Sequence, residues 1–424
     1  MVSSIIKYIL VLLLFTTASL PSYAAFNASP PTQGAFFNGK YRNLAAEFGK
    51  TNGIDKLNQG FNSMFGYNGK QQLYYAYSEN GQYKAHYIRA INPTSGDDIR
   101  SEGQSWGMTI AVMMNKQEEF DNLWRFARRY QKNSWSHSDP NKQGVYAWQL
   151  KFDSNGYVYK NDDGPAPDGE LYFAFSLLNA DARWGSQGEF NYYDDAIEIL
   201  GVIRNKLMED SIIRFSPYLD NLTDPSYHIP VFYNYFATRV SSNHERDFWN
   251  SAATKSRVFL KNHFTKVSGN PHWNLPTFLA QNNGEPIIDY LFNGQANPGH
   301  WYEYDAWRVA MNVATDAHLY GAESWHKDTI NSLLGFLDYD KNASSDKCYK
   351  QLYSYGSAET QQCAGTGQKA TNAVATLAST DSSIATDFFN DFWSESQPTG
   401  DWRYYNGCLY MLAMLHVTGN FKLY

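Results

Sequence analysis

Three carboxylates stand at the starts of apolar segments that lie far apart in the sequence. Glu102 occurs in SEGQSWGM, Asp168 in APDGELYF and Asp305 in WYEYDAWR. A pair of acids can hydrolyse a glycosidic bond, because one donates a proton while the other activates water. An acid at a helix start more often caps the helix or interacts with its dipole. Asp305 could also form a plain ion pair with Arg308, three residues further on.

Aromatic side chains accompany these acids. A flat ring can pack against the C–H face of a sugar, although an aromatic residue taken singly is more often part of the core. The aromatic residues near the acids are Trp106, Trp148, Tyr227, Trp301, Tyr304, Trp307, Trp402 and Tyr405. Acids and aromatic rings together indicate polysaccharide hydrolysis.

Other chemistries find no matching motif. The ten His and three Cys show no HExxH or CxxC spacing, so we expect no metal ion and no cofactor. The sequence has neither a P-loop nor a G-x-S-x-G motif. The formal charge is -7 and no basic block is present, so a nucleic-acid partner is not expected. Neutral polymers remain as substrates.

Two kinds of helical segment alternate along the chain. Six are amphipathic, at residues 43–65, 116–132, 192–208, 246–264, 324–339 and 385–395. Six are apolar nearly all round, at residues 102–114, 167–182, 227–240, 304–319, 367–379 and 404–417. An apolar helix must be surrounded by protein, so the pattern predicts an all-α fold with the apolar helices ringed by the others. This is an (α/α)6 barrel.

The loops of this barrel are long and aromatic, and Asn155-Gly156 predicts a short β-hairpin among them. If the inner helices run parallel to one another, their starts gather at one end of the barrel. We therefore expect a cluster formed by Glu102, Asp168, Tyr227, Asp305 and Tyr405.

Residues 1–24 have the pattern of a secretory signal peptide. Lys7 precedes the apolar run YILVLLLF, and small residues flank a cleavage site before Ala25. Residues 25–424 contain no linker and no membrane-spanning run, so we expect one secreted catalytic domain that acts as a monomer and contacts no membrane.

Three cysteines in an exported chain predict one disulfide and one leftover thiol. Cys348 and Cys363 bracket a polar loop, whereas Cys408 lies in an apolar run. We expect the first two to pair, which contributes about 3 kcal/mol by loop entropy. Cys408 should be buried.

The motifs SEGQSWGM, APDGELYFAFSLLNADARW and WYEYDAWR resemble glycoside hydrolase family 8, with the greatest similarity to its bacterial endo-1,4-β-xylanases. The resemblance runs from about Ala25 to Tyr424. It departs from the family signature at Pro167, Glu170 and Phe173, which indicates a subgroup.

The resemblance implies an inverting hydrolase. Glu102 matches the general acid, Asp305 the general base, and Asp168 the signature acid near subsite −1. Tyr227 matches the tyrosine that helps to hold the nucleophilic water. For Glu102 to stay protonated, apolar cover or a nearby acid must raise its pKa.

We therefore expect a secreted endo-1,4-β-xylanase that hydrolyses xylan. The alternatives are a family 8 β-glucanase, a chitosanase, an exo-oligoxylanase, or a non-catalytic glycan-binding protein. The expected substrate-binding residues are Trp106, Trp148, Tyr304, Arg308 and Tyr405. For Arg308, the sequence leaves open whether it contacts substrate or supports the charge of the base.

Overall fold

A computed structural model describes residues 26–28, 30, 32–67, 71–79, 81, 83–268, 275–292, 295–354 and 357–424. The signal peptide predicted over residues 1–24, and Ala25 after it, lie outside the described residues. In the described part of the chain, every helix is too short or too polar to cross a membrane.

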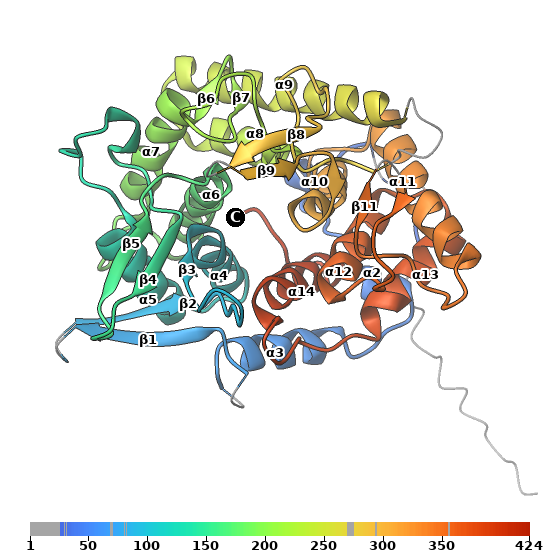
Figure 1. Cartoon of the computed structure of the whole chain (residues 1–424), viewed down its shortest axis with the longest axis horizontal. Helices are drawn as coiled ribbons and strands as arrows, with labels where there is room; N and C mark the ends of the chain where they lie inside the picture. The colour runs from blue at the N-terminus through green and yellow to red at the C-terminus, as the bar shows by residue number, and fades with distance from the viewer. Residues whose placement is uncertain are drawn as a thin grey trace, which may run out of the picture.

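Six helices form the inner ring of a barrel, seen end-on in Figure 1. They are α4 (Ser101–Met113), α6 (Pro167–Trp184), α8 (Pro230–Arg239), α10 (Asp305–Leu319), α12 (Thr366–Ala375) and α14 (Arg403–Val417). Each packs against the next, and α14 packs against α4 to close the ring. In α4 every residue except Glu102 is buried, and in α10 every residue except Asp305 is buried. The apolar sequences of these helices are therefore explained by burial on all sides.

Six further helices surround the inner ring. They are α3 (Gly53–Met64), α5 (Gln117–Phe126), α7 (Tyr192–Val202), α9 (Asn243–Ser268), α11 (Ser324–Ala343) and α13 (Ser382–Trp393). Each packs against an inner partner: α3 on α14, α5 on α4, α7 on α6, α9 on α8, α11 on α10 and α13 on α12. The predicted (α/α)6 barrel is confirmed.

One amphipathic segment differs from its prediction. Residues 43–65 form two helices, α2 (Leu44–Glu47) and α3, preceded by α1 (Ala35–Asn38). The break falls at Gly49, whose φ of 71° is left-handed and cannot continue a right-handed helix. The periodicity of the segment was helical on both sides of the break, which is why it read as one helix.

Small antiparallel sheets occupy the loops. β1 (Tyr74–Glu79) pairs with β2 (Tyr83–Ile88), β6 (Met208–Glu209) with β7 (Ile212–Ile213), and β8 (Asp289–Phe292) with β9 (Gln295–Pro298). Two three-stranded sheets have the orders β3 (Ile99–Arg100), β4 (Gln149–Phe152), β5 (Val158–Asp162), and β10 (Trp301–Tyr302), β11 (Tyr353–Ser354), β12 (Ser357–Ala358). Since β3 leads directly into α4, and β10 ends just before α10, these two sheets border the helices that carry Glu102 and Asp305.

The predicted hairpin and disulfide are both confirmed. β4 and β5 pair from Phe152 opposite Val158, and Gly156 in the turn has a φ of 82°, a conformation that favours glycine. Cys348 is bonded to Cys363, and Cys408 is a buried free thiol.

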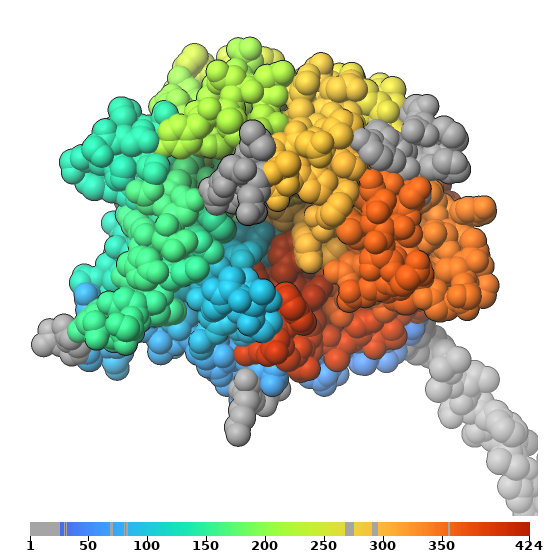
Figure 2. Space-filling view, viewed as in Figure 1, coloured from blue at the N-terminus to red at the C-terminus, as the bar shows by residue number. Residues whose placement is uncertain are grey.

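The inner helices approach closely at the end that carries the acids. A Cβ atom on Gly169 of α6 would lie 2.6 Å from the Ser101 Oγ atom at the start of α4. Only glycine permits this spacing, and it brings the first turns of α4 and α6 together. Figure 2 shows the same face of the molecule hollowed near its centre, among the segments that carry α4, α10 and α14.

Candidate active site

The predicted convergence of the three acids is confirmed. Glu102 lies in the first turn of α4, Asp168 in the first turn of α6, and Asp305 is the first residue of α10. Their common neighbour is the guanidinium of Arg308. Its Nη1 atom is 2.8 Å from Asp168 Oδ2 and 3.6 Å from Glu102 Oε2, and its Nη2 atom is 2.9 Å from Asp305 Oδ1. One buried cation therefore joins acids from three helices.

Glu102 has the environment of a proton donor. Burial raises the pKa of Glu102 to about 8; the cation of Arg308 opposes the rise, and the charges of Asp305 and Asp168 add to it. The side chain is nevertheless 13% exposed. Burial thus favours the protonated form of Glu102 at neutral pH, and the side chain can still be reached from the barrel end.

Asp305 is the most exposed of the three acids, with 23% of its side chain accessible. Its Oδ1 atom forms an ion pair of 2.9 Å with Arg308 Nη2 and accepts a hydrogen bond of 3.0 Å from the Tyr405 hydroxyl. One ion pair and one hydrogen bond on the same oxygen orient the carboxylate and leave Oδ2 free of a described partner. This arrangement suits a base that takes a proton from water.

Asp168 is more enclosed. Its side chain is 4% exposed, and its Oδ1 atom accepts a hydrogen bond of 2.9 Å from the backbone N–H of Gly169. Burial raises the pKa of Asp168, and the cation of Arg308 opposes the rise.

Tyr227 ends a 3-10 turn (Pro225–Tyr227) that precedes α8. The sequence pattern had indicated that the inner helix begins at Tyr227, but α8 begins three residues later, at Pro230. Ser226, next to it, accepts a hydrogen bond of 3.0 Å from Arg308 Nη2. Burial raises the pKa of Tyr227, and the charges of Asp168, Asp224 and Asp305 add to the rise, so its side chain belongs to the same cluster.

Two residues expected to bind substrate lie beneath the site instead. Trp106 is fully buried, and its ring packs 5.3 Å from the guanidinium carbon of Arg308. Arg308 itself is 2% exposed. Neither side chain presents a large surface to a sugar, which favours the charge-supporting role that the sequence left open for Arg308, with Trp106 packed against it.

The other expected substrate-binding residues lie at the accessible end of the barrel. Tyr304 is 50% exposed, and Trp148 and Tyr405 are partly buried. The carbonyl of Trp148 accepts a hydrogen bond of 3.0 Å from the N–H of Ser101, which holds this residue beside the start of α4. Tyr304 has a φ of 36°, a strained conformation for a residue other than glycine, directly before Asp305.

Two residues of the cluster, Tyr404 and Asp224, were not predicted from the sequence. Tyr404 donates a hydrogen bond of 2.9 Å to Glu102 Oε1. Asp224 is fully buried, and its Oδ1 atom accepts a hydrogen bond of 2.7 Å from the N–H of Ser226. Burial raises the pKa of Asp224 well above its usual range, and Asp305 adds to the rise. The Asp-Pro pair at 224–225, typical of a turn start, was the available signal for Asp224.

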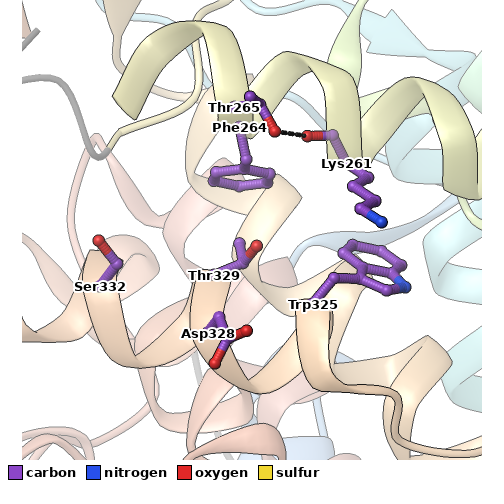
Figure 3. A pocket seen from close by; sticks show the side chains of 7 residues that line it. All are labelled: Lys261, Phe264, Thr265, Trp325, Asp328, Thr329 and Ser332. Atoms are coloured by element: carbon purple, nitrogen blue, oxygen red, sulfur yellow. Dashed lines mark hydrogen bonds between the residues drawn. The ribbon is translucent and has the colours of Figure 1, made fainter. Parts of the chain in front are cut away.

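A separate pocket of about 320 Å³ lies on the outer ring between α9 and α11 (Figure 3). Its lining residues are Lys261, Phe264, Thr265, Trp325, Asp328, Thr329 and Ser332. Asp328 is the single acid among them, so the pocket lacks the pair that glycoside hydrolysis requires. The end of the barrel is therefore the candidate active site.

Among the described residues, one cluster has side chains suited to a metal ion: Asp346, Cys348 and Cys363. Its two cysteines are joined in the disulfide, and Lys350 Nζ lies 2.7 Å from Asp346 Oδ2. A bonded sulfur pair and a paired acid do not fit a metal centre.

Comparisons with known proteins agree with this geometry. A solved structure of a cold-adapted family 8 xylanase is 68% identical, with a TM-score of 0.92, over 94% of this chain and 98% of that one. A reducing end xylose-releasing exo-oligoxylanase of Halalkalibacterium halodurans is 33% identical over 93% of this chain and 97% of its own length. Endoglucanase 2 of Ruminiclostridium josui is 27% identical over 76% of this chain and 64% of its own length.

The family model described as "Glycosyl hydrolases family 8" matches residues 67–419. That range contains all three acids and Arg308. The chain belongs to glycosyl hydrolases family 8 and is a glycoside hydrolase.

Proposed function

We propose that this chain is a secreted endo-1,4-β-xylanase that cleaves internal bonds of xylan with inversion of configuration. The observation that carries the proposal is the pairing across one guanidinium of Glu102, whose pKa is raised by burial, with the partly exposed, hydrogen-bonded carboxylate of Asp305. The 68% identity to a protein described as a family 8 xylanase supports xylan as the substrate. The disulfide supports export, because such bonds persist in oxidising compartments.

In this mechanism Glu102 gives its proton to the glycosidic oxygen as the bond to the anomeric carbon breaks. Water attacks the opposite face of that carbon and loses its proton to Asp305. Asp168 and Tyr227 would contact the sugar and the water, and Arg308 would balance the charge of the acids. The reaction needs no metal ion or cofactor, and we propose that a single chain carries it out.

Inversion makes a direct stereochemical prediction. In an inverting enzyme the two carboxyl groups stand roughly 6.5–9.5 Å apart, which leaves room for the attacking water between Asp305 and the sugar. Xylan should therefore release the α-anomer first, and proton NMR before mutarotation would detect it. First formation of the β-anomer, or a sugar ester trapped on Asp305, would instead identify Asp305 as a nucleophile.

A second candidate is the reducing-end exo-oligoxylanase, because three relatives with that description match this chain at 29–33% identity. We favour endo action because the motifs SEGQSWGM, APDGELYFAFSLLNADARW and WYEYDAWR resemble those of family 8 endo-1,4-β-xylanases. A β-glucanase finds weaker support, at 24–27% identity to five endoglucanase or β-glucanase relatives. A non-catalytic protein would not need to retain all three acids.

Hydrolysis of xylohexaose should distinguish endo from exo action. An endo enzyme should give xylobiose to xylotetraose as early products, and should cleave borohydride-reduced xylohexaose at a rate within about twofold of the unreduced chain. Chromatography of early products measures both the product lengths and the rate on the reduced chain. Early products limited to xylose and xylopentaose, together with loss of activity on the reduced chain, would favour the exo enzyme and contradict the proposal.

A further inference from the structure

The proton donor has a close partner that the mechanism above does not use. Tyr404 is the second residue of α14, and its hydroxyl donates a hydrogen bond of 2.9 Å to Glu102 Oε1. The other oxygen, Glu102 Oε2, faces Arg308 at 3.6 Å. Oε1 is therefore held by a hydrogen bond, while Oε2 has only a longer contact with the Arg308 guanidinium.

The residues on both sides of Glu102 shape the position of Tyr404. A Cβ atom on Gly103 would lie 2.6 Å from the Cε2 and hydroxyl atoms of Tyr404, so only glycine lets the ring approach. On the other side, the guanidinium carbon of Arg100 lies 5.7 Å from the centre of the Tyr404 ring. The ring is 4% exposed, so it is held between α14 and the first turn of α4.

We propose that Tyr404 is the positioning residue of the general acid. Its hydroxyl holds Glu102 Oε1, so that Oε2 carries the proton to the glycosidic oxygen. After transfer, the same hydroxyl stabilises the carboxylate that remains. The proposal rests on Glu102 being the general acid, as inferred above.

The neighbouring tyrosine has a different partner. Tyr405 donates its hydrogen bond to Asp305 on α10, whereas Tyr404 donates to Glu102 on α4. Successive residues of a helix point about 100° apart, so adjacent tyrosines of α14 reach different neighbouring helices. The pair separates an effect on the acid from an effect on the base.

The direction of the pH effect follows from the groups around Glu102. The charged or titratable groups that act on it are Arg308 and Asp305 of α10, Asp168 and Tyr172 of α6, Arg100 before α4, and Tyr404, Tyr405 and Cys408 of α14. Burial raises the pKa of Tyr404 well above its usual range, so the hydroxyl keeps its proton and remains a donor. A donor favours the ionised carboxylate, so its removal should raise the pKa of Glu102 further.

The test is Tyr404→Phe, which keeps the ring and removes the hydroxyl. On unactivated xylan we expect kcat to fall by about 10- to 100-fold with KM changed less than about threefold, the range for loss of a hydrogen bond to a charged group. The alkaline limb of the pH profile should move to higher pH. An aryl xylobioside with a good leaving group needs little acid assistance, so its hydrolysis should fall much less.

Four comparison variants make the result decisive. Tyr410→Phe changes a buried tyrosine of the same helix that packs against Phe392, and it should leave activity unchanged. Tyr405→Phe should alter the acidic limb, which reports the base. Gly103→Ala should displace the Tyr404 ring and reproduce the effect of Tyr404→Phe. Burial raises the pKa of Glu303 to about 7, so Glu303 could also contribute to the alkaline limb of the pH profile. Glu303→Gln should leave that limb in place if the limb reports Glu102.

The outcomes separate this inference from the assignment of Glu102. If Glu102→Gln spares the activated substrate but Tyr404→Phe impairs both substrates equally, or leaves the alkaline limb in place, the role of Tyr404 is refuted. If Glu102→Gln itself shows no dependence on the leaving group, the assignment of Glu102 fails instead. Circular dichroism melting of each variant confirms that the folded protein is being compared.

Discussion

Replacement of Glu102 by glutamine is expected to lower kcat on unactivated xylan by roughly 100- to 10,000-fold, the usual range for general acid assistance. The amide keeps the shape of the side chain but has no acidic proton, so binding of xylo-oligosaccharides should change little. Steady-state kinetics and calorimetric titration with xylotriose measure the two effects separately.

A matched control exists in Glu170. Burial raises the pKa of Glu170 to about 8, as it does for Glu102, but Glu170 Oε1 accepts a hydrogen bond of 2.9 Å from the N–H of Tyr146 in the core. The folded Glu170→Gln protein should therefore keep a kcat close to that of the wild type. If Glu102→Gln kept a tenth of wild-type turnover, Glu102 would not be the acid.

Among the variants proposed here, removal of the Arg308 side chain should lower the free energy of unfolding the most. Arg308→Met keeps an apolar stem of similar length but leaves Glu102, Asp168 and Asp305 without their shared cation. Loss of one partner of a buried ion pair typically costs about 3–5 kcal/mol in the free energy of unfolding. Activity should also fall by at least about 100-fold, since the carboxylates lose their orientation and charge balance.

The stability loss should depend on pH. Without Arg308 the folded protein holds its carboxyl groups protonated to higher pH, whereas in the unfolded chain these groups ionise near pH 4. The folded variant then binds more protons than the unfolded one, so its stability falls as pH rises above about 4. Urea unfolding at pH 5 and pH 8 should show a smaller deficit at pH 5.

Arg204→Met is a suitable control for that measurement. Its guanidinium lies 3.9 Å from Glu245 at the surface, so its loss should change the unfolding free energy by no more than about 1 kcal/mol. An equal deficit of Arg308→Met at both pH values would mean that Arg308 acts through packing and not through charge.

Most of the fold could be predicted from the sequence, because the degree of burial of each helix determines how apolar its residues are. Inner helices have no solvent face, so segments such as 102–114 and 304–319 are apolar all round, and their alternation with amphipathic segments determines the barrel. The break at Gly49 was missed because helical periodicity continues on both sides of it, although Gly49 and the Asn52-Gly53 pair are typical of a helix end and a turn.

Within the site, residue type predicted the acids but not the contacts of Arg308. Spacing along α10 suggested only its pairing with Asp305, since contacts with α4 and α6 depend on how the ring closes. For the same reason the sequence predicted Tyr405 as part of the cluster but did not predict that Tyr404 contacts Glu102. Adjacent residues of a helix face different neighbours, and the sequence does not give the rotation of α14 about its axis.

The shared guanidinium of Arg308 also constrains how such an enzyme can diverge. Loss of any one acid leaves Arg308 with two carboxyl partners, whereas loss of Arg308 leaves three acids without their shared cation. Mutational paths that first replace an acid are therefore open, and paths that first replace the arginine pass through an unstable intermediate. A lineage that moves its catalytic base to another loop should lose Asp305 early and keep Arg308 until last.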